Sequence, residues 1–151
     1  MYEDTAYGST AWVSPNSVMA SDDVFASNTN PQDAKSLRCS NFSFNVPTGA
    51  TINGVECRVY RYSSGVNAVK DFEIMLSWGG SRGGTNKANL ADYWPTSEVA
   101  VTYGGAADKW NVALMYTDVN NYLFGVYVRP YKPGGAGYAY IDYIEMRVNY
   151  T

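Results

Sequence analysis

An alternation of apolar and polar residues on both sides of a Pro-Thr-Gly break most constrains how this chain folds. The stretch SFNVPTGATINGVECRVYRY, residues 43–62, places Val55, Cys57 and Val59 on one side of an extended backbone, with polar residues between them. Successive strand residues point to opposite faces of a sheet, so this period of two predicts strands with one buried face. Proline ends a ladder and glycine accepts positive φ, so the break predicts a turn.

Similar patterns recur along all 151 residues, bounded by Gly, Pro, Asn or Asp. The candidate strands are residues 11–13, 23–27, 37–46, 52–62, 69–78, 98–105, 122–131 and 138–151. About eight short strands without a definite helix favour an antiparallel two-sheet β-sandwich, with a jelly roll as the expected topology. We expect residues 1–151 to form a single all-β domain.

Three segments carry more detailed expectations. The buried face of residues 69–78 is predicted to carry Phe72, Ile74, Leu76 and Trp78. The buried face of residues 138–151 is predicted to carry Ile144, Met146 and Val148, with Tyr140 and Asp142 on the same side. The alternation changes phase within residues 37–46, which predicts a bulge or bend near Ser40–Asn41. Residues 108–121 fit a helical face or an extended chain, and we expect a strand or an irregular segment that closes in a turn.

Charge and terminal sequence exclude two classes of partner. The formal net charge is −3, and the eleven Lys and Arg residues are scattered singly. A row of phosphates needs a basic stripe, so we expect no nucleic acid partner. The first ten residues lack the basic and apolar regions of a signal peptide, and no apolar run is long enough for a bilayer. We therefore expect synthesis in the cytoplasm and no membrane partner.

Enzymatic activity has no support in the residue types. The chain contains no histidine, which excludes Ser-His-Asp and Cys-His nucleophile systems and any histidine-ligated metal. A glycosidase needs two carboxyl groups that face one sugar. Glu56, Asp71 and Glu73 alternate outward on predicted strands, which a solvated sheet face explains better. We expect a protein that is not an enzyme.

Metal and cofactor signals are equally weak. The segments at 21–23 (SDD) and 118–121 (DVNN) offer oxygen ligands of the kind calcium prefers, but without EF-hand spacing. Asp and Asn at such breaks normally bond to the turn backbone. The glycine-rich loop at 79–87 lacks the phosphate-loop pattern. We therefore expect no metal, no cofactor, and a buried apolar role for Cys57 in preference to a disulfide with Cys39.

Aromatic residues near irregular loops provide the one candidate ligand site. Trp78, Arg82, Tyr93 and Trp94 flank predicted loop tips, where aromatic faces can stack on sugar rings. The alternative is that Trp78 and Trp94 are anchors of the core or of the loops.

Several stretches together resemble a family of β-sandwich modules found in the virion structural proteins of tailed phages and prophages. They are Trp12 with Pro15, Ser21–Ser27, Asn41–Arg61, Thr102–Trp110, Asp118–Val128 and Tyr140–Thr151. They span nearly the whole chain in order. The sequence departs from the family pattern at Cys57, where Val or Ile is expected.

The resemblance implies a structural or adhesive component of the virion rather than an enzyme. The first expectation is a capsid decoration or cement protein that stabilises the particle through contacts with the major capsid protein or other virion proteins. A homotrimer would match the threefold positions of a capsid lattice. The alternative is a receptor- or carbohydrate-binding module of a tail or head fibre that binds a cell-surface glycan.

Overall fold

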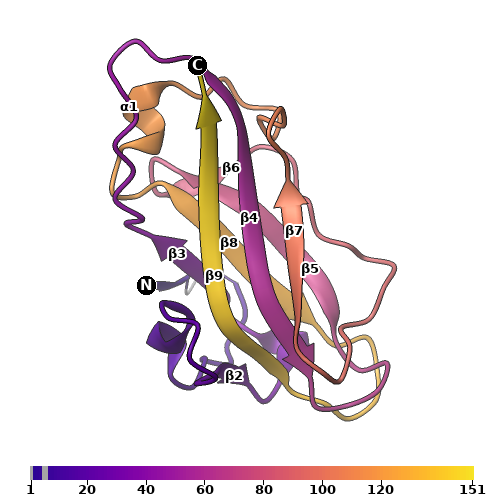
Figure 1. The fold of residues 1–151 in the computed structure, drawn as a ribbon. Helices are drawn as coiled ribbons and strands as arrows, with labels where there is room; N and C mark the ends of the chain where they lie inside the picture. The colour runs from indigo at the N-terminus through magenta and orange to yellow at the C-terminus, as the bar shows by residue number, and fades with distance from the viewer. Residues whose placement is uncertain (1, 5–6) are drawn as a thin grey trace.

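Two antiparallel sheets face each other across a hydrophobic core (Figure 1). The computed structural model describes residues 2–4 and 7–151. One sheet has the order β1 (Tyr2–Asp4), β3 (Ser36–Ser40), β8 (Gly125–Tyr131), β5 (Lys70–Trp78) and β6 (Ser81–Gly83). The other has the order β2 (Ala26–Asn28), β9 (Ala139–Tyr150), β4 (Ile52–Ser63) and β7 (Val99–Gly104). Three short helical turns lie outside the sheets: η1 (Pro15–Val18), η2 (Pro31–Asp33) and α1 (Tyr116–Val119).

This architecture confirms the predicted all-β antiparallel sandwich. Apart from the three-residue β1 at one edge, each sheet has four strands, in agreement with the predicted number. The jelly-roll topology stays a prediction.

The long strands β4 and β9 pair along most of their length and form the centre of the four-stranded sheet (Figure 1). On β4, the predicted inward residues Val55, Cys57 and Val59 are all fully buried. The alternation in β4 therefore forms one wall of the core, as predicted.

The Pro-Thr-Gly break forms the predicted turn. The amide of Ala50 donates to the carbonyl of Pro47 at 3.1 Å, and Gly49 has a φ of +83°. An added Cβ on Gly49 would meet nothing within 4 Å. Backbone conformation, and not space, therefore favours glycine at this position.

The phase change near Ser40 marks the end of a strand. β3 stops at Ser40, and both Asn41 and Ser43 have positive φ, at 66° and 56°. The expected bulge is therefore an exit from the sheet. Phe42 and Phe44 still pack against the core from this irregular segment.

A β-bulge overturns part of the face assignment in β5. Ile74 and Leu76 are buried as predicted, but Phe72 is 45% exposed while Asp71 is 1% exposed. The pairing with β8 shifts register between Asp71 and Glu73, so Phe72 is the extra residue. An inserted residue exchanges the inward and outward faces of the strand residues that precede it. Asp71 therefore points into the core. Trp78 at the end of β5 is also 37% exposed, contrary to prediction.

A second irregularity divides β9 in the same way. Tyr60 pairs with Tyr143, but Arg61 pairs with Ile141, so Asp142 is passed over. Ile141 is buried on one side of the irregularity and Ile144 on the other. The prediction is right for Ile144, Met146 and Val148, all of which contact the core. It is wrong for Tyr140, which is only partly buried and stacks on Tyr62 of the outer face, because the extra residue reverses the alternation. Asp142, the extra residue itself, is buried at 1% exposure.

Residues 108–121 are irregular except for the single turn of α1, consistent with the expectation of an irregular segment. Trp110 is fully buried, and its Nε1 donates to the carbonyl of Val55 at 2.9 Å. Gly104 has a φ of +77°, and an added Cβ would lie 2.5 Å from Nε1 of Trp110. A residue with a side chain at position 104 would displace the indole.

A buried carboxylate joins the two sheets inside the core. Asp71 of β5 accepts bonds from Trp94 Nε1 at 2.7 Å, from the hydroxyl of Tyr103 at 2.8 Å and from the amide of Asn89 at 3.0 Å. Arg61 Nη2 lies 3.4 Å from Asp71 Oδ1, and its guanidinium stacks 4.6 Å from the centre of the Trp94 ring. Burial, and then the charge of Asp71, raise the pKa of Tyr103, so its phenol stays a neutral donor.

We expect Asp71→Ala to lower the free energy of unfolding by about 3–5 kcal/mol, because Arg61 would remain as a buried charge without its partner. Urea denaturation followed by tryptophan fluorescence measures the change. Asp92→Ala is the control, because Asp92 accepts its hydrogen bond from Asn89 at an exposed site, and should cost less than about 1 kcal/mol. Equal losses in the two variants would contradict this account of the core.

The two cysteines are buried thiols on different sheets, Cys39 on β3 and Cys57 on β4. Burial raises the pKa of Cys39 to about 12 and also raises that of Cys57. The thiolate is the reactive form, so both groups should be inert in the native state. This arrangement agrees with the expected apolar role of Cys57.

We expect DTNB at about pH 8 to label neither thiol in the native protein and both after denaturation, because the thiolate is the nucleophile. Absorbance at the released thionitrobenzoate band measures the labelling. Rapid labelling of the native protein would contradict the burial of these residues.

Candidate functional site

The four residues predicted to contact a sugar do not form one site. Trp94 is 1% exposed, and its indole N–H is bonded to Asp71 in the core. Its assignment as a glycan contact is wrong, because a ring enclosed between the sheets has no face for a ligand. Trp94 is instead one of the core anchors that the alternative interpretation proposed.

Arg82 is held by neighbours on the outer face of the five-stranded sheet. It forms an ion pair with Glu73, whose other donor is the hydroxyl of Ser36 at 2.6 Å. Its guanidinium lies 4.1 Å from the ring centre of Tyr7 and 4.3 Å from that of Tyr127. These contacts fix Arg82 between two aromatic rings and tie β6 to β5.

Trp78 and Tyr93 keep some exposure, at 37% and 39%, but they lie at opposite ends of β5. Tyr93 forms an isolated backbone β-bridge with Lys70 at the start of β5, and the Lys70 ammonium lies 4.2 Å from the centre of the Tyr93 ring. At about 3.3 Å per residue, the two ends of this strand are separated by roughly 26 Å. One sugar ring cannot contact both.

The structure instead gathers aromatic side chains on the outer face of the four-stranded sheet. Tyr62 of β4 stacks on Tyr140 of β9 with ring centres 4.7 Å apart and planes inclined by 7°. Phe25 meets Tyr62 edge to face at 5.1 Å. Tyr60 and Tyr143 form the next pair along the strands at 5.7 Å. We call Phe25, Tyr60, Tyr62, Tyr140 and Tyr143 the tyrosine face.

Charged pairs continue the same face beyond Tyr60. Arg58 lies 3.3 Å from Glu145, and Arg147 lies 3.8 Å from Glu56. A hollow of about 60 Å³ lies among these four residues, Thr102 and Met146. It is far smaller than the roughly 300–1,000 Å³ of a small-molecule pocket. This end of the sheet is therefore a shallow, charged surface.

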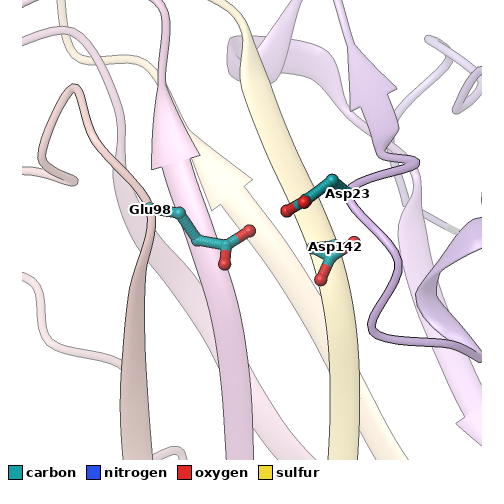
Figure 2. Close-up of side chains that lie close together, drawn as sticks. All are labelled: Asp23, Glu98 and Asp142. Carbon is teal, nitrogen blue, oxygen red and sulfur yellow. The ribbon is translucent and has the colours of Figure 1, made fainter.

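Three carboxylates meet on the same outer face around Asp142, which lies on β9 between Tyr140 and Tyr143 (Figure 2). Asp23 precedes β2, Glu98 precedes β7 and Asp142 lies on β9, so three separate segments supply them. One oxygen from each lies within 4.8 Å of the others. Partial burial, followed by the charges of Asp142 and Asp23, raises the pKa of Glu98. We call these residues the acid triplet.

The acidic side chains of the two turn segments that offer calcium ligands take two kinds of position. Asp22 accepts a bond from the amide of Val24 at 3.1 Å, and Asp118 accepts one from the amide of Met115 at 2.7 Å. Asn121 does the same for Leu123 at 2.9 Å. These side chains bond to the local backbone, as expected for turns. Asp23 instead faces Glu98 and Asp142 from a backbone with a φ of 60°.

Sequence reasoning missed both the tyrosine face and the acid triplet. The two bulges decide which side of each strand faces out, and nothing in residues 138–151 alone marks the extra residue at Asp142. The run of tyrosines at 60, 62, 140 and 143 was visible, but their pairing depends on the register of β4 against β9.

Comparison of the chain with protein-family models, with curated proteins and with solved structures finds no match. The resemblance to phage virion modules therefore stays a prediction from sequence motifs. Among residues 2–4 and 7–151, no helix has the length and apolar character needed to cross a bilayer.

Proposed function

We propose that the protein is a non-enzymatic structural protein of a phage virion, and specifically a decoration or cement protein of the capsid surface. The observation that carries this proposal is the tyrosine face on the central strands β4 and β9. A surface on which tyrosines gather suits contact with another protein. Its partners would be the major capsid protein or other virion proteins.

The tyrosine face has the anatomy of a protein interface. Aromatic rings form its centre, and the Arg58–Glu145 and Arg147–Glu56 pairs lie toward one end. Interfaces commonly combine an aromatic centre with a polar rim. The rings already contact one another in the free protein, so binding would cost little side-chain entropy.

The disposition of two buried acids, Asp71 and Glu73, supports a non-enzymatic role. Asp71 is enclosed by Trp94, Tyr103 and Arg61, and Glu73 is engaged by Ser36 and Arg82. Both carboxylates are used for structure, in contrast to the outward, solvated face that the alternation predicted for them. Neither is presented to a ligand.

A decoration role places many copies on a symmetric particle, where cyclic oligomers are common. A homotrimer at the threefold positions of the lattice is the assembly we propose. Quantitative mass spectrometry of purified virions should then find on the order of hundreds of copies per particle. Cryo-electron microscopy of the same particles locates the protein. A few copies per particle would contradict the decoration role.

We expect the double variant Tyr60→Ala, Tyr143→Ala to lower occupancy on particles by at least about tenfold, because central aromatic contacts carry much of the energy of an interface. Rebinding of the purified protein to particles that lack it measures this loss. Tyr122→Ala is the control, because Tyr122 is 69% exposed on the loop after α1. Full rebinding by the double variant, with a native circular dichroism spectrum, would exclude the tyrosine face as the contact.

A receptor- or carbohydrate-binding module is the second candidate, and Trp78 is the observation that favours it. The indole packs on Gly83, where an added Cβ would lie 3.3 Å from Cε3, and it remains 37% exposed. A glycan array tests this function with the wild type and Trp78→Ala. Binding that Trp78→Ala abolishes would favour the adhesive role, and a blank array at high protein concentration would exclude it.

A further inference from the structure

We propose that Asp23, Glu98 and Asp142 bind one divalent cation, with Ca²⁺ as the preferred ion, on the outer face of the four-stranded sheet. The proposal does not rest on the virion function. It follows from the burial of Asp142, from the convergence of three carboxylates, and from the absence, among the described residues, of an ion pair between any of them and a Lys or Arg.

Asp142 provides the strongest observation. Its side chain is on β9 and is 1% exposed, yet Oδ1 has no hydrogen-bond partner within the described residues. A buried carboxylate without a partner is costly and is rarely retained. The buried Asp71 shows the usual solution, with three hydrogen bonds and an arginine. Asp142 has instead two further carboxylates beside it.

The geometry suits a single ion. Ca²⁺ binds oxygens at about 2.3–2.6 Å, so two ligands on opposite sides of it are separated by roughly 4.6–5.2 Å. One oxygen from each member of the acid triplet falls within 4.8 Å of the others. Figure 2 shows Asp23 and Glu98 turned toward each other across the sheet, with Asp142 between their segments. An ion at their centre can therefore contact all three without a change of backbone.

The electrostatics favour a cation at this position. Among the described residues, no Lys or Arg forms an ion pair with Asp23, Glu98 or Asp142. Repulsion from the other two acids contributes to the raised pKa of Glu98. A divalent ion would replace this repulsion with attraction.

The donor set selects the ion. Three carboxylates provide hard oxygen ligands, which favour Ca²⁺ over the softer transition metals. Mg²⁺ usually keeps several waters and takes one or two carboxylates, whereas Ca²⁺ accepts six to eight ligands in flexible geometry. Asp23 and Glu98 are exposed, so water can complete the coordination. We therefore expect Ca²⁺ to bind more tightly than Mg²⁺.

Binding would cross-link three distant parts of the chain. Asp23 lies on the segment that leads into edge strand β2, and Glu98 lies at the entrance to edge strand β7. Asp142 belongs to the central strand β9. An ion held by all three would fasten both edges of the sheet to its centre, and would fix the approach of Phe25 to Tyr62 and Tyr140.

Isothermal titration of EDTA-treated protein with CaCl₂ tests the site directly. We expect one ion per chain with a dissociation constant between about 10⁻⁵ and 10⁻³ M. Differential scanning fluorimetry should show a rise in Tm with Ca²⁺ and a smaller rise with Mg²⁺. No binding heat and no change in Tm at about 10 mM Ca²⁺, well above this range, would overturn the proposal.

Glu98→Gln and Asp142→Asn should each weaken Ca²⁺ binding by at least about tenfold, because each removes one charged ligand. In the Ca²⁺-free protein, the three converging carboxylates repel one another. Glu98→Gln should therefore raise the Tm in EDTA at neutral pH while it reduces the rise in Tm that Ca²⁺ produces. Loss of a residue with a purely structural role would not raise the Tm in EDTA and also reduce the rise in Tm with Ca²⁺.

Asp118→Asn is the matched control, because it removes the same charge from the other acidic turn, where Asp118 bonds to the amide of Met115. It should retain the Ca²⁺ affinity of the wild type. If Asp142→Asn does not fold, the exposed Glu98→Gln still decides the result. Wild-type affinity in Glu98→Gln, or an equal loss in Asp118→Asn, would overturn the assignment.

Discussion

The contact between Asp71 and Arg61 is the interaction on which the rest of the sandwich depends. Apolar packing holds the sheets together without fixing their relative position, whereas a buried carboxylate with directed donors specifies one arrangement. Asp71 extends from β5 of one sheet, while Arg61 and Tyr103 come from the other. The same carboxylate holds the irregular segment before β7 through Trp94 and Asn89. A single side chain therefore sets the spacing of the sheets and the path of a long connection.

Two single-residue irregularities place polar groups where function needs them. The bulge at Phe72 turns Asp71 into the core and leaves the phenyl ring outside, 45% exposed. The irregularity at Asp142 turns Tyr140 outward onto Tyr62 and brings Asp142 beside Asp23. Bulges redirect side chains without interrupting the sheet. A single extra residue in a strand therefore places both the buried Asp71 in one sheet and the tyrosine face on the other.

The outer face of the four-stranded sheet carries the tyrosines, ion pairs and carboxylates that have no role in the core. Paired tyrosines lie along β4 and β9, ion pairs lie toward one end, and the acid triplet meets at Asp142, between Tyr140 and Tyr143. The five-stranded sheet also carries exposed aromatic side chains, Phe72 and Trp78, and on its outer face Arg82 is held between Tyr7 and Tyr127. The proposed protein contact and the proposed cation site both fall on the four-stranded sheet. A bound ion would stiffen the surface that the proposed partner contacts.

The alternation of residues by itself determined the two-sheet architecture, the inward face of β4 and the turn at Pro47–Ala50, because these depend on neighbours in sequence. The burial of Asp71, the core position of Trp94 and the assembly of the acid triplet were decided only by the tertiary structure. Each depends on strand register or on a bulge, and one extra residue exchanges inside for outside while it leaves the local pattern almost unchanged. Local preferences specify that a strand forms, and contacts with distant strands specify which way its side chains point.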